Sequence, residues 1–192
     1  MRFTDVTGLA SLALPITAIA LLIPRVASLP KSRLAAVLAL VALLTLAPLR
    51  GLPLLAYVRS VTGDLSITAA VLACAAIASA VSGWPAIDAR NRLALRALIV
   101  LVAIALYPMA LGIGCFDPYR LGYGQPWFMG SLLLVTLAAW FARLHLLASC
   151  IALAVLAWTV GWYESSNLWD YLLDPLVASY ALGALILRSK RR

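Results

Sequence analysis

Charged residues are scarce in this chain, and their scarcity excludes an ordinary soluble domain. Only 11% of the 192 residues are charged, whereas charged residues approach a quarter of a typical soluble domain. Hydrophobic residues make up 65% of the sequence, and the mean hydropathy is +1.02. The composition therefore predicts an all-α integral membrane protein with no separate soluble domain.

Histidine and cysteine are nearly missing too. Because His145 is the single histidine, bis-histidine haem ligation and histidine-rich metal sites within this chain are excluded. Cys74, Cys115 and Cys150 stand alone, without the Cys-x-x-Cys spacing of metal sites. We interpret the cysteines as small apolar residues, and we expect no metal ion and no cofactor.

What the chain does have is long apolar stretches. Each is near the length of about 20 residues that a helix needs to cross a hydrocarbon core of roughly 30 Å. We therefore expect residues 1–192 to form one polytopic transmembrane domain with about seven helices, six being possible. The stretches cover residues 7–24, 34–49, 65–83, 94–114, 127–142, 144–162 and 171–187.

Basic residues are unevenly distributed among the breaks between these stretches. Eleven lie at alternate breaks and in the C-terminal tail, and four lie on the opposite side. Because cytoplasmic loops carry the excess of Lys and Arg, we place the N-terminus outside and the C-terminus in the cytoplasm. The four outer basic residues are Arg2, Arg50, Arg59 and Arg120.

The net charge of +8 is explained by this topology and by anionic lipid. The chain contains no motif of a nucleic-acid-binding module, so we expect no nucleic-acid partner. Arg outnumbers Lys thirteen to two, and Ala and Leu dominate. This composition suits a GC-rich bacterial genome, and it predicts a multi-pass protein of the bacterial inner membrane.

Residues 127–162 could be drawn as one helix or as two. One helix would reach roughly 54 Å, which is too long for the bilayer core, and it would export the basic tail. We therefore predict two helices that meet near Arg143. A related alternative concerns the first stretch, which could be a cleaved signal peptide; its more basic C-terminal flank favours an uncleaved anchor instead.

Prolines interrupt several stretches. Pro15 and Pro108 predict kinks. Pro48 and Pro53 bracket Arg50-Gly51, so the second helix is predicted to break there and to continue as a short segment through Arg59. Backbone that leaves the helix at membrane depth must be buried or line a wet cavity, which suggests an outward-facing cavity.

The predicted outer loops combine both signs of charge with aromatic residues. Acids beside aromatics can recognise a cationic head group, and Arg beside Tyr can hold a phosphate. An aromatic belt explains part of this enrichment, but the enrichment is greater outside than inside. The candidate ligand-binding residues are Arg59, Asp64, Asp117, Tyr119, Arg120, Glu164, Trp169 and Asp170.

Three outer acids have structural alternatives to a chemical role. Asp64 is interpreted first as the N-cap of the following helix, although it could pair with Arg59 or act as an intramembrane carboxylate. Asp170 and Asp174 would share a proton if they lay on one helical face. Pro175 favours Asp174 as an N-cap instead.

Signatures of known membrane enzymes are missing. Of the acids, only Asp88 lies on the predicted side of His145, so a Ser-His-Asp triad is not expected. Val61-Thr62-Gly63-Asp64 differs from the Gly-x-Gly-Asp of intramembrane aspartyl proteases, because Val61 occupies the first glycine position. Motifs of signal peptidase II, of phosphatases and of CDP-alcohol transferases do not occur.

The expected function is that of an accessory or binding protein with a periplasmic-face site. Its ligand would be a membrane lipid head group or a membrane-protein partner, in envelope lipid or polysaccharide assembly. One alternative is a small-solute or lipid transporter in which Arg59 or Asp64 faces a central path. Another is a membrane enzyme that uses outer-face carboxylates.

Overall fold

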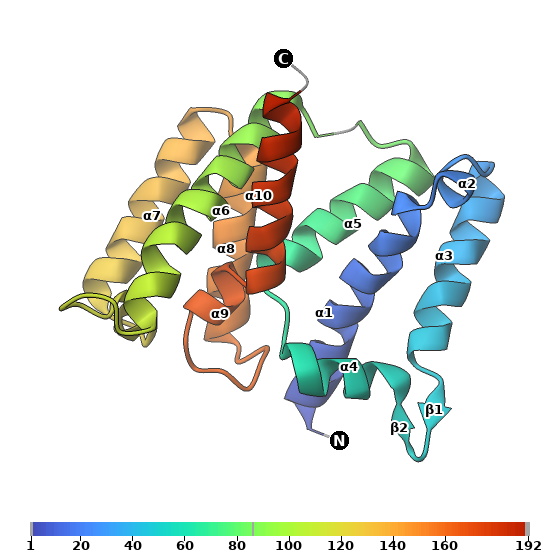
Figure 1. Ribbon diagram of the computed structural model, residues 1–192, viewed down its shortest axis with the longest axis horizontal. Helices are drawn as coiled ribbons and strands as arrows, with labels where there is room; N and C mark the ends of the chain where they lie inside the picture. Colours follow the sequence, from blue (N-terminus) through green and yellow to red (C-terminus); the bar gives the residue numbers. More distant parts are fainter. Residues whose placement is uncertain (1, 86, 191–192) are drawn as a thin grey trace. The chain divides into compact units, whose positions relative to one another are not determined.

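The computed structural model describes residues 2–85 and 87–190, and it is mostly helical (Figure 1). By spatial contacts the chain divides into two compact units. The first consists of Met1–Leu65 with Ala69–Ala86, and the second consists of Ser66–Thr68 with Ile87–Arg192. The elements of the described residues, in chain order, are α1 (Phe3–Ile19), η1 (Ala20–Leu22), α2 (Pro24–Ala27), α3 (Lys31–Thr45), β1 (Pro48–Leu49), β2 (Leu52–Pro53), α4 (Leu54–Thr62), α5 (Ile67–Ser82), α6 (Ala89–Ala110), η2 (Pro118–Gly122), α7 (Pro126–Phe141), α8 (His145–Thr159), α9 (Trp169–Leu172) and α10 (Pro175–Ser189).

In the first unit, α1 packs against α3 and α4. The predicted break of the second apolar stretch is confirmed, since α3 ends at Thr45 and a small antiparallel hairpin follows. Arg50 and Gly51 form its turn with φ angles of 49° and 90°, the left-handed region that tight hairpin turns require. The hydroxyl of Tyr57 donates a hydrogen bond to the carbonyl oxygen of Leu49 at 2.9 Å. This bond fastens the hairpin to α4, the predicted short segment.

In the second unit, α6 and α10 run antiparallel side by side, and α7 and α8 form a second antiparallel pair (Figure 1). Ala154 and Ala181 are completely buried, and small residues of this kind allow helices to approach closely. The division of residues 127–162 into two helices is confirmed. Arg143 makes the turn between them with a φ of 57°.

Asn91 fixes this turn to the start of α6. Its side-chain amide donates to the carbonyl oxygen of Arg143 at 3.1 Å, and its side-chain oxygen accepts from the backbone N–H of Leu146 at 3.0 Å. Asp88 caps α6 by accepting from the backbone N–H of Asn91. These donors hold the pKa of the Asp88 carboxyl below its usual range.

Every one of the seven predicted apolar stretches contains a helix, but the helices differ in length. Among the described residues, Phe3–Leu22 and Ala89–Ala110 are long and apolar enough to cross a membrane, whereas Ile67–Ser82, Pro126–Phe141, His145–Thr159 and Pro175–Ser189 are shorter apolar helices. Core helices of soluble proteins and signal sequences share the properties of the two long ones.

Candidate functional site

The eight candidate residues fall into two groups that belong to different units. Arg59 and Asp64 lie in the first unit, and the other six lie in the second. The structure joins Arg59 to Asp64, and it joins Tyr119, Trp169 and Asp170 through one hydrogen-bonded network.

Arg59 lies between two carboxylates, and we call Asp5, Arg59 and Asp64 the Arg59 cluster. The Nε atom of Arg59 donates to Oδ1 of Asp64 at 2.6 Å, and the Nη2 atom donates to Oδ2 of Asp64 at 2.9 Å. Its Nη1 lies 3.4 Å from Oδ1 of Asp5 on α1. The side chains of Arg59 and Asp64 are only 17% and 16% exposed. This fork-like pairing is the strong, geometrically specific form of an arginine–carboxylate contact.

Gly8 is the residue that lets the Arg59 cluster approach α1. A Cβ atom at Gly8 would lie 2.4 Å from Oδ1 of Asp64 and 2.8 Å from Cζ of Arg59. Neither distance is compatible with a carbon side chain. The ion pair therefore packs directly on the backbone of α1, a contact that the sequence analysis missed.

Asp64 is consequently not the N-cap of the following helix, as the sequence analysis first interpreted it. Helix α5 begins only at Ile67, three residues beyond Asp64, and both carboxylate oxygens of Asp64 accept from Arg59. The alternative pairing with Arg59 is the one observed. The charge of a nearby guanidinium outweighs a capping interaction because its hydrogen bonds are charge-assisted and bidentate.

Asp174 is confirmed as an N-cap, and it does more than the sequence predicts. Its Oδ1 accepts from the backbone N–H of Val177 at 2.8 Å, with Pro175 in the first turn of α10. Its Oδ2 accepts from both the backbone N–H and the hydroxyl of Ser66, at 3.0 and 2.6 Å. One buried carboxylate thus holds the start of α10 and the segment that precedes α5.

In the second unit, two predicted outer loops meet in what we call the loop cluster: Tyr119, Ser165, Asn167, Trp169 and Asp170. The hydroxyl of Tyr119 lies 2.8 and 3.0 Å from the two carboxylate oxygens of Asp170. The hydroxyl of Ser165 donates to the same carboxylate. The indole N–H of Trp169 donates to the carbonyl oxygen of Pro118 at 3.0 Å.

Asn167 is the centre of the loop cluster, and the sequence analysis did not single it out. It is 1% exposed; its amide donates to the carbonyl oxygen of Tyr119, and its oxygen accepts from the backbone N–H of Trp169. A Cβ atom at Gly122 would lie only 1.8 Å from that oxygen. The signal available in the sequence was weak, since a polar residue and a glycine in two different loops reveal their contact only after folding.

Burial and the neighbouring Asp170 carboxylate raise the pKa of the Tyr119 hydroxyl above its usual range. Tyr119 therefore remains a neutral donor, and Asp170 remains its acceptor. Every carboxylate oxygen of Asp170 has a donor within the chain. This arrangement is typical of a carboxylate that stabilises loops.

Asp170 and Asp174 do not form the proton-sharing pair considered from their spacing. Helix α9 ends at Leu172, and Leu173 is extended, with φ −146° and ψ 138°. Because the helix stops between them, the two acids do not share a helical face. Each accepts hydrogen bonds from its own set of donors instead.

No known protein family, curated protein or solved structure matches this chain. What the site can do must therefore be argued from its own geometry. Within the described residues, no three His, Cys, Asp or Glu side chains are grouped so that they could hold a metal ion.

The remaining three candidates take no part in the network of Asp170. The side chain of Asp117 accepts from the backbone N–H of Tyr119 at 2.9 Å and so starts the short helix η2. Arg120 and Glu164 are exposed. They leave one positive and one negative charge accessible beside the loop cluster.

Three aromatic side chains stand out from the same loops, and we call Phe116, Tyr123 and Trp127 the aromatic rim. They are 56%, 57% and 89% exposed. Tyr123 packs edge-on against Tyr119, with ring centroids 6.1 Å apart. Phe128, the neighbour of Trp127, packs on Trp169 with centroids 4.6 Å apart. The loop cluster thus contacts Tyr123 of the aromatic rim directly and contacts the start of α7 through Phe128.

Proposed function

We propose that this chain is a multi-pass inner-membrane protein that acts by binding, and that the aromatic rim contacts a lipid head group at the extracytoplasmic face. One observation carries the proposal. Asp117 and Asp170 accept hydrogen bonds from donors in the chain, whereas Glu164 and the aromatic side chains of the rim are exposed. A site of this kind presents an exposed surface for binding, and the hydrogen bonds of Asp117 and Asp170 support the loops beneath it.

The apolar surface of the helices supports a membrane location. Helix α6 exposes Leu101 and Ile104 at 68% each, and α7 exposes Leu133 and Leu134 at 60% and 69%. Apolar surface that continues along helices in this way is rare on soluble monomers. Hydrocarbon chains of lipid would cover it at no cost in solvation.

The shorter helices fit the same proposal. Helices of 15 or 16 residues, such as α7 and α8, are roughly 22–24 Å long, against a hydrocarbon core of roughly 30 Å. Local thinning of the bilayer and the apolar residues of the adjoining turns accommodate a mismatch of this size at modest cost.

The aromatic rim suits the interface between lipid and water. Tyr and Trp have an apolar body and a polar edge, and they are enriched at the level of the head groups. The exposed Arg120 and Glu164 add one charge of each sign, which matches a zwitterionic head group with a phosphate and an ammonium. The proposed ligand is therefore a phospholipid head group.

The transporter and enzyme alternatives depend on Arg59, Asp64 and Asp170. The first two bind each other and are mostly buried, and the third is held by Tyr119 and Ser165. These contacts favour a structural role for all three. Binding is accordingly the function that we put forward.

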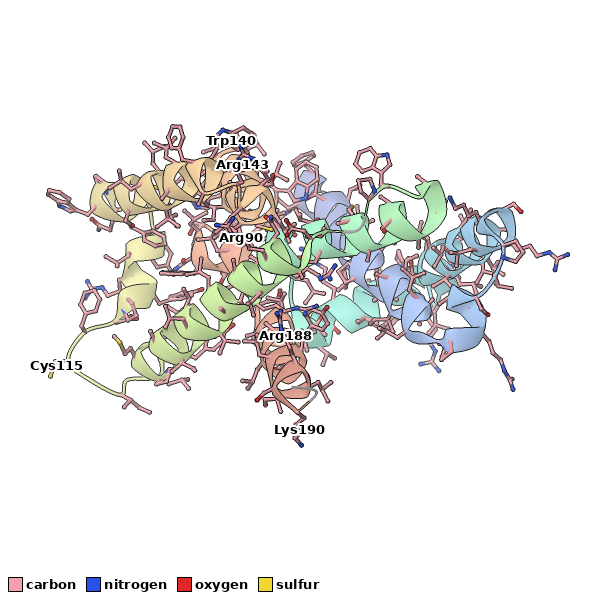
Figure 2. The ribbon with its side chains drawn as sticks, turned by 90° about the horizontal axis from the view of Figure 1, so that it is seen from above. Arg90, Cys115, Trp140, Arg143, Arg188 and Lys190 are labelled. Atoms are coloured by element: carbon pink, nitrogen blue, oxygen red, sulfur yellow. The ribbon has the colours of Figure 1, made fainter. Side chains whose placement is uncertain are left out.

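The test is native mass spectrometry of the protein extracted gently from its own membrane. Wild type is expected to retain lipid that the double variant Tyr123→Ala, Trp127→Ala releases. The matched control is Trp140→Ala, which removes a tryptophan that is 57% exposed at the other end of α7 (Figure 2).

Release by the double variant alone supports the site. Equal release by Trp140→Ala, or no bound lipid in wild type, contradicts it. If wild type instead retains a protein that the double variant releases, the ligand of this surface is a membrane-protein partner and not a lipid.

A further inference from the structure

We propose a second binding site at the end of the second unit opposite the loop cluster. Its ligand is a phosphate group that carries a net negative charge. A pocket of about 460 Å³ lies between the start of α6 and the end of α10. We call it the arginine pocket. Its walls are Ala89, Arg92, Arg96, Ala184, Leu187 and Arg188.

The arginines of this pocket differ in burial from the other basic residues predicted to face the cytoplasm. Arg92, Arg96 and Arg188 are partly buried. The positive-inside rule requires only basic residues in loops, so it does not explain why these three converge on one pocket from two helices. The exposed basic residues of the same predicted side are Arg25, Lys31, Arg33, Arg90, Arg143 and Lys190.

Arg96 lies well inside the helix. It is seven residues beyond the first residue of α6, which places its Cα roughly 10 Å along the helix axis. Its Nη2 donates to the hydroxyl of Tyr180 at 2.9 Å, and its guanidinium lies 5.3 Å from the centre of the Tyr180 ring. These contacts from α10 fix the guanidinium while its charge remains uncompensated.

Helix dipoles do not account for this placement. Arg188 lies in the last turn of α10, where a cation is favourable, but Arg92 lies in the first turn of α6, where a cation is unfavourable. Arg92 donates to the carbonyl oxygen of Ile87, which carries no formal charge. A bound anion would relieve the repulsion among the three guanidiniums.

None of these three arginines forms an ion pair in the described part of the chain, where the ion pairs all involve Arg59. The nearest acid in sequence, Asp88, accepts hydrogen bonds from Asn91. The walls of the pocket therefore contain three basic side chains and no acidic one, while Asp88 attracts Arg92 from outside the walls.

The chemistry of the walls indicates the ligand. Guanidinium groups bind phosphate oxygens in pairs, and the side chains of Leu187 and Ala184 provide an apolar wall beside them. Basic pockets between membrane helices on the cytoplasmic side bind the head groups of anionic lipids. The phosphate chemistry follows from the pocket itself, whereas the lipid as its carrier rests on the proposed membrane location.

The test uses the full chain, delipidated in detergent and titrated with phosphatidylglycerol or phosphatidylcholine under native mass spectrometry. A second arm titrates inorganic phosphate and glycerol 3-phosphate by calorimetry. Arg96→Gln and Arg188→Gln are expected to weaken binding about tenfold each, since a charge-assisted hydrogen bond contributes about 1.5 kcal/mol or more. The controls Arg90→Gln and Lys190→Gln each remove one positive charge at an exposed position, near the start of α6 and at the end of α10 respectively (Figure 2). They should change binding by less than about twofold.

Each outcome decides the proposal. Binding of phosphatidylglycerol alone that the pocket variants weaken supports a lipid phosphate, and binding of soluble phosphate with the same variant pattern supports a free phosphate. The site is overturned if the protein shows no preference for phosphatidylglycerol and binds no soluble phosphate. It is also overturned if the control variants weaken binding as much as the pocket variants do.

Arg188→Gln carries the test if Arg96→Gln does not fold, because only Arg96 bonds to Tyr180. The Tyr123→Ala, Trp127→Ala double variant should leave this binding unchanged, so failure of the aromatic rim is distinguishable from failure of the pocket.

Discussion

Single residues decide how closely the Arg59 cluster packs on α1. At Gly8 even one methyl group would overlap with both members of the ion pair. Overpacking in such a contact costs about 1–3 kcal/mol, and here it would also separate charged groups that are mostly buried.

Gly8→Ala is therefore expected to lower the free energy of unfolding by about 1–3 kcal/mol. Thermal unfolding in detergent, followed by circular dichroism, measures the change. The matched control is Gly130→Ala in α7, where an added Cβ meets nothing within 4 Å, so that variant should be neutral or slightly more stable. A Gly8→Ala protein as stable as the control would show that the Arg59 cluster does not rest on α1.

Tyr119 links stability to alkaline pH. Its folded-state pKa is raised above the unfolded value near 10, so the folded protein keeps this proton after the unfolded chain has lost it. The stabilisation is complete below about pH 10 and is lost as the pH rises above it.

Tyr119→Phe should cost about 1–2 kcal/mol at neutral pH through its lost hydrogen bond to Asp170. It should also make the decline of stability above about pH 10 shallower than in wild type. Thermal unfolding between pH 8 and pH 11 measures both effects. Tyr123→Phe, at a tyrosine that is 57% exposed, should reproduce the wild-type decline; a variant at position 119 with an unchanged decline would contradict this prediction.

At the scale of whole elements, helix starts are held by side chains, and Asp174 holds two chain segments at once. It is 5% exposed and accepts from Val177 and from two groups of Ser66. Removing a buried acceptor leaves its donors without partners, which costs more than the bond itself.

Asp174→Ala is expected to lower stability by about 2–4 kcal/mol, and Ser66→Ala by about 1 kcal/mol. Asp88→Ala removes another N-cap, but an exposed one that serves α6 alone, and should cost about 1 kcal/mol. Chemical denaturation of the three variants gives the ranking. Equal losses at Asp174 and Asp88 would mean that the bonds to Ser66 contribute nothing.

Elements also show how far local sequence signals reach. The breaks at Pro48–Pro53 and at Arg143 were predictable because proline chemistry and helix length are local properties. The hairpin at the first break was not, since Arg50 adopts a left-handed conformation that other residues than glycine seldom take. The hydrogen bond from Tyr57 to Leu49 holds the residue that precedes Arg50 in this turn.

At the scale of the whole molecule, the proposed topology can be tested at a cysteine already present. Cys115 is exposed in the loop after α6 (Figure 2), whereas Cys150 is buried. If the N-terminus lies outside, the end of α6 also lies outside, and Cys115 faces the periplasm.

In a Cys74→Ala background, which removes the other exposed cysteine, a membrane-impermeant maleimide is therefore expected to label the protein in intact spheroplasts, and Cys115→Ala should abolish the labelling. Ser189→Cys in the Cys115→Ala background is the opposite control, at the end of α10, and should react only after lysis. Labelling of Cys115 only after lysis would reverse the topology, and the aromatic rim would then face the cytoplasm.

The sequence by itself determined the helices of this protein, because apolar stretches, prolines and glycines act within a few residues of one another. It also indicated the loops in which the candidate residues lie. Only the tertiary structure decided what those residues do: Asp64 pairs with Arg59 and does not cap a helix, Asp170 binds Tyr119 and not a second acid, and Asn167 fills the space left by Gly122. The contacts of Asp170 and Asn167 join groups about 50 residues apart, and all of these hydrogen bonds depend on angstrom-scale geometry that spacing along a chain does not encode.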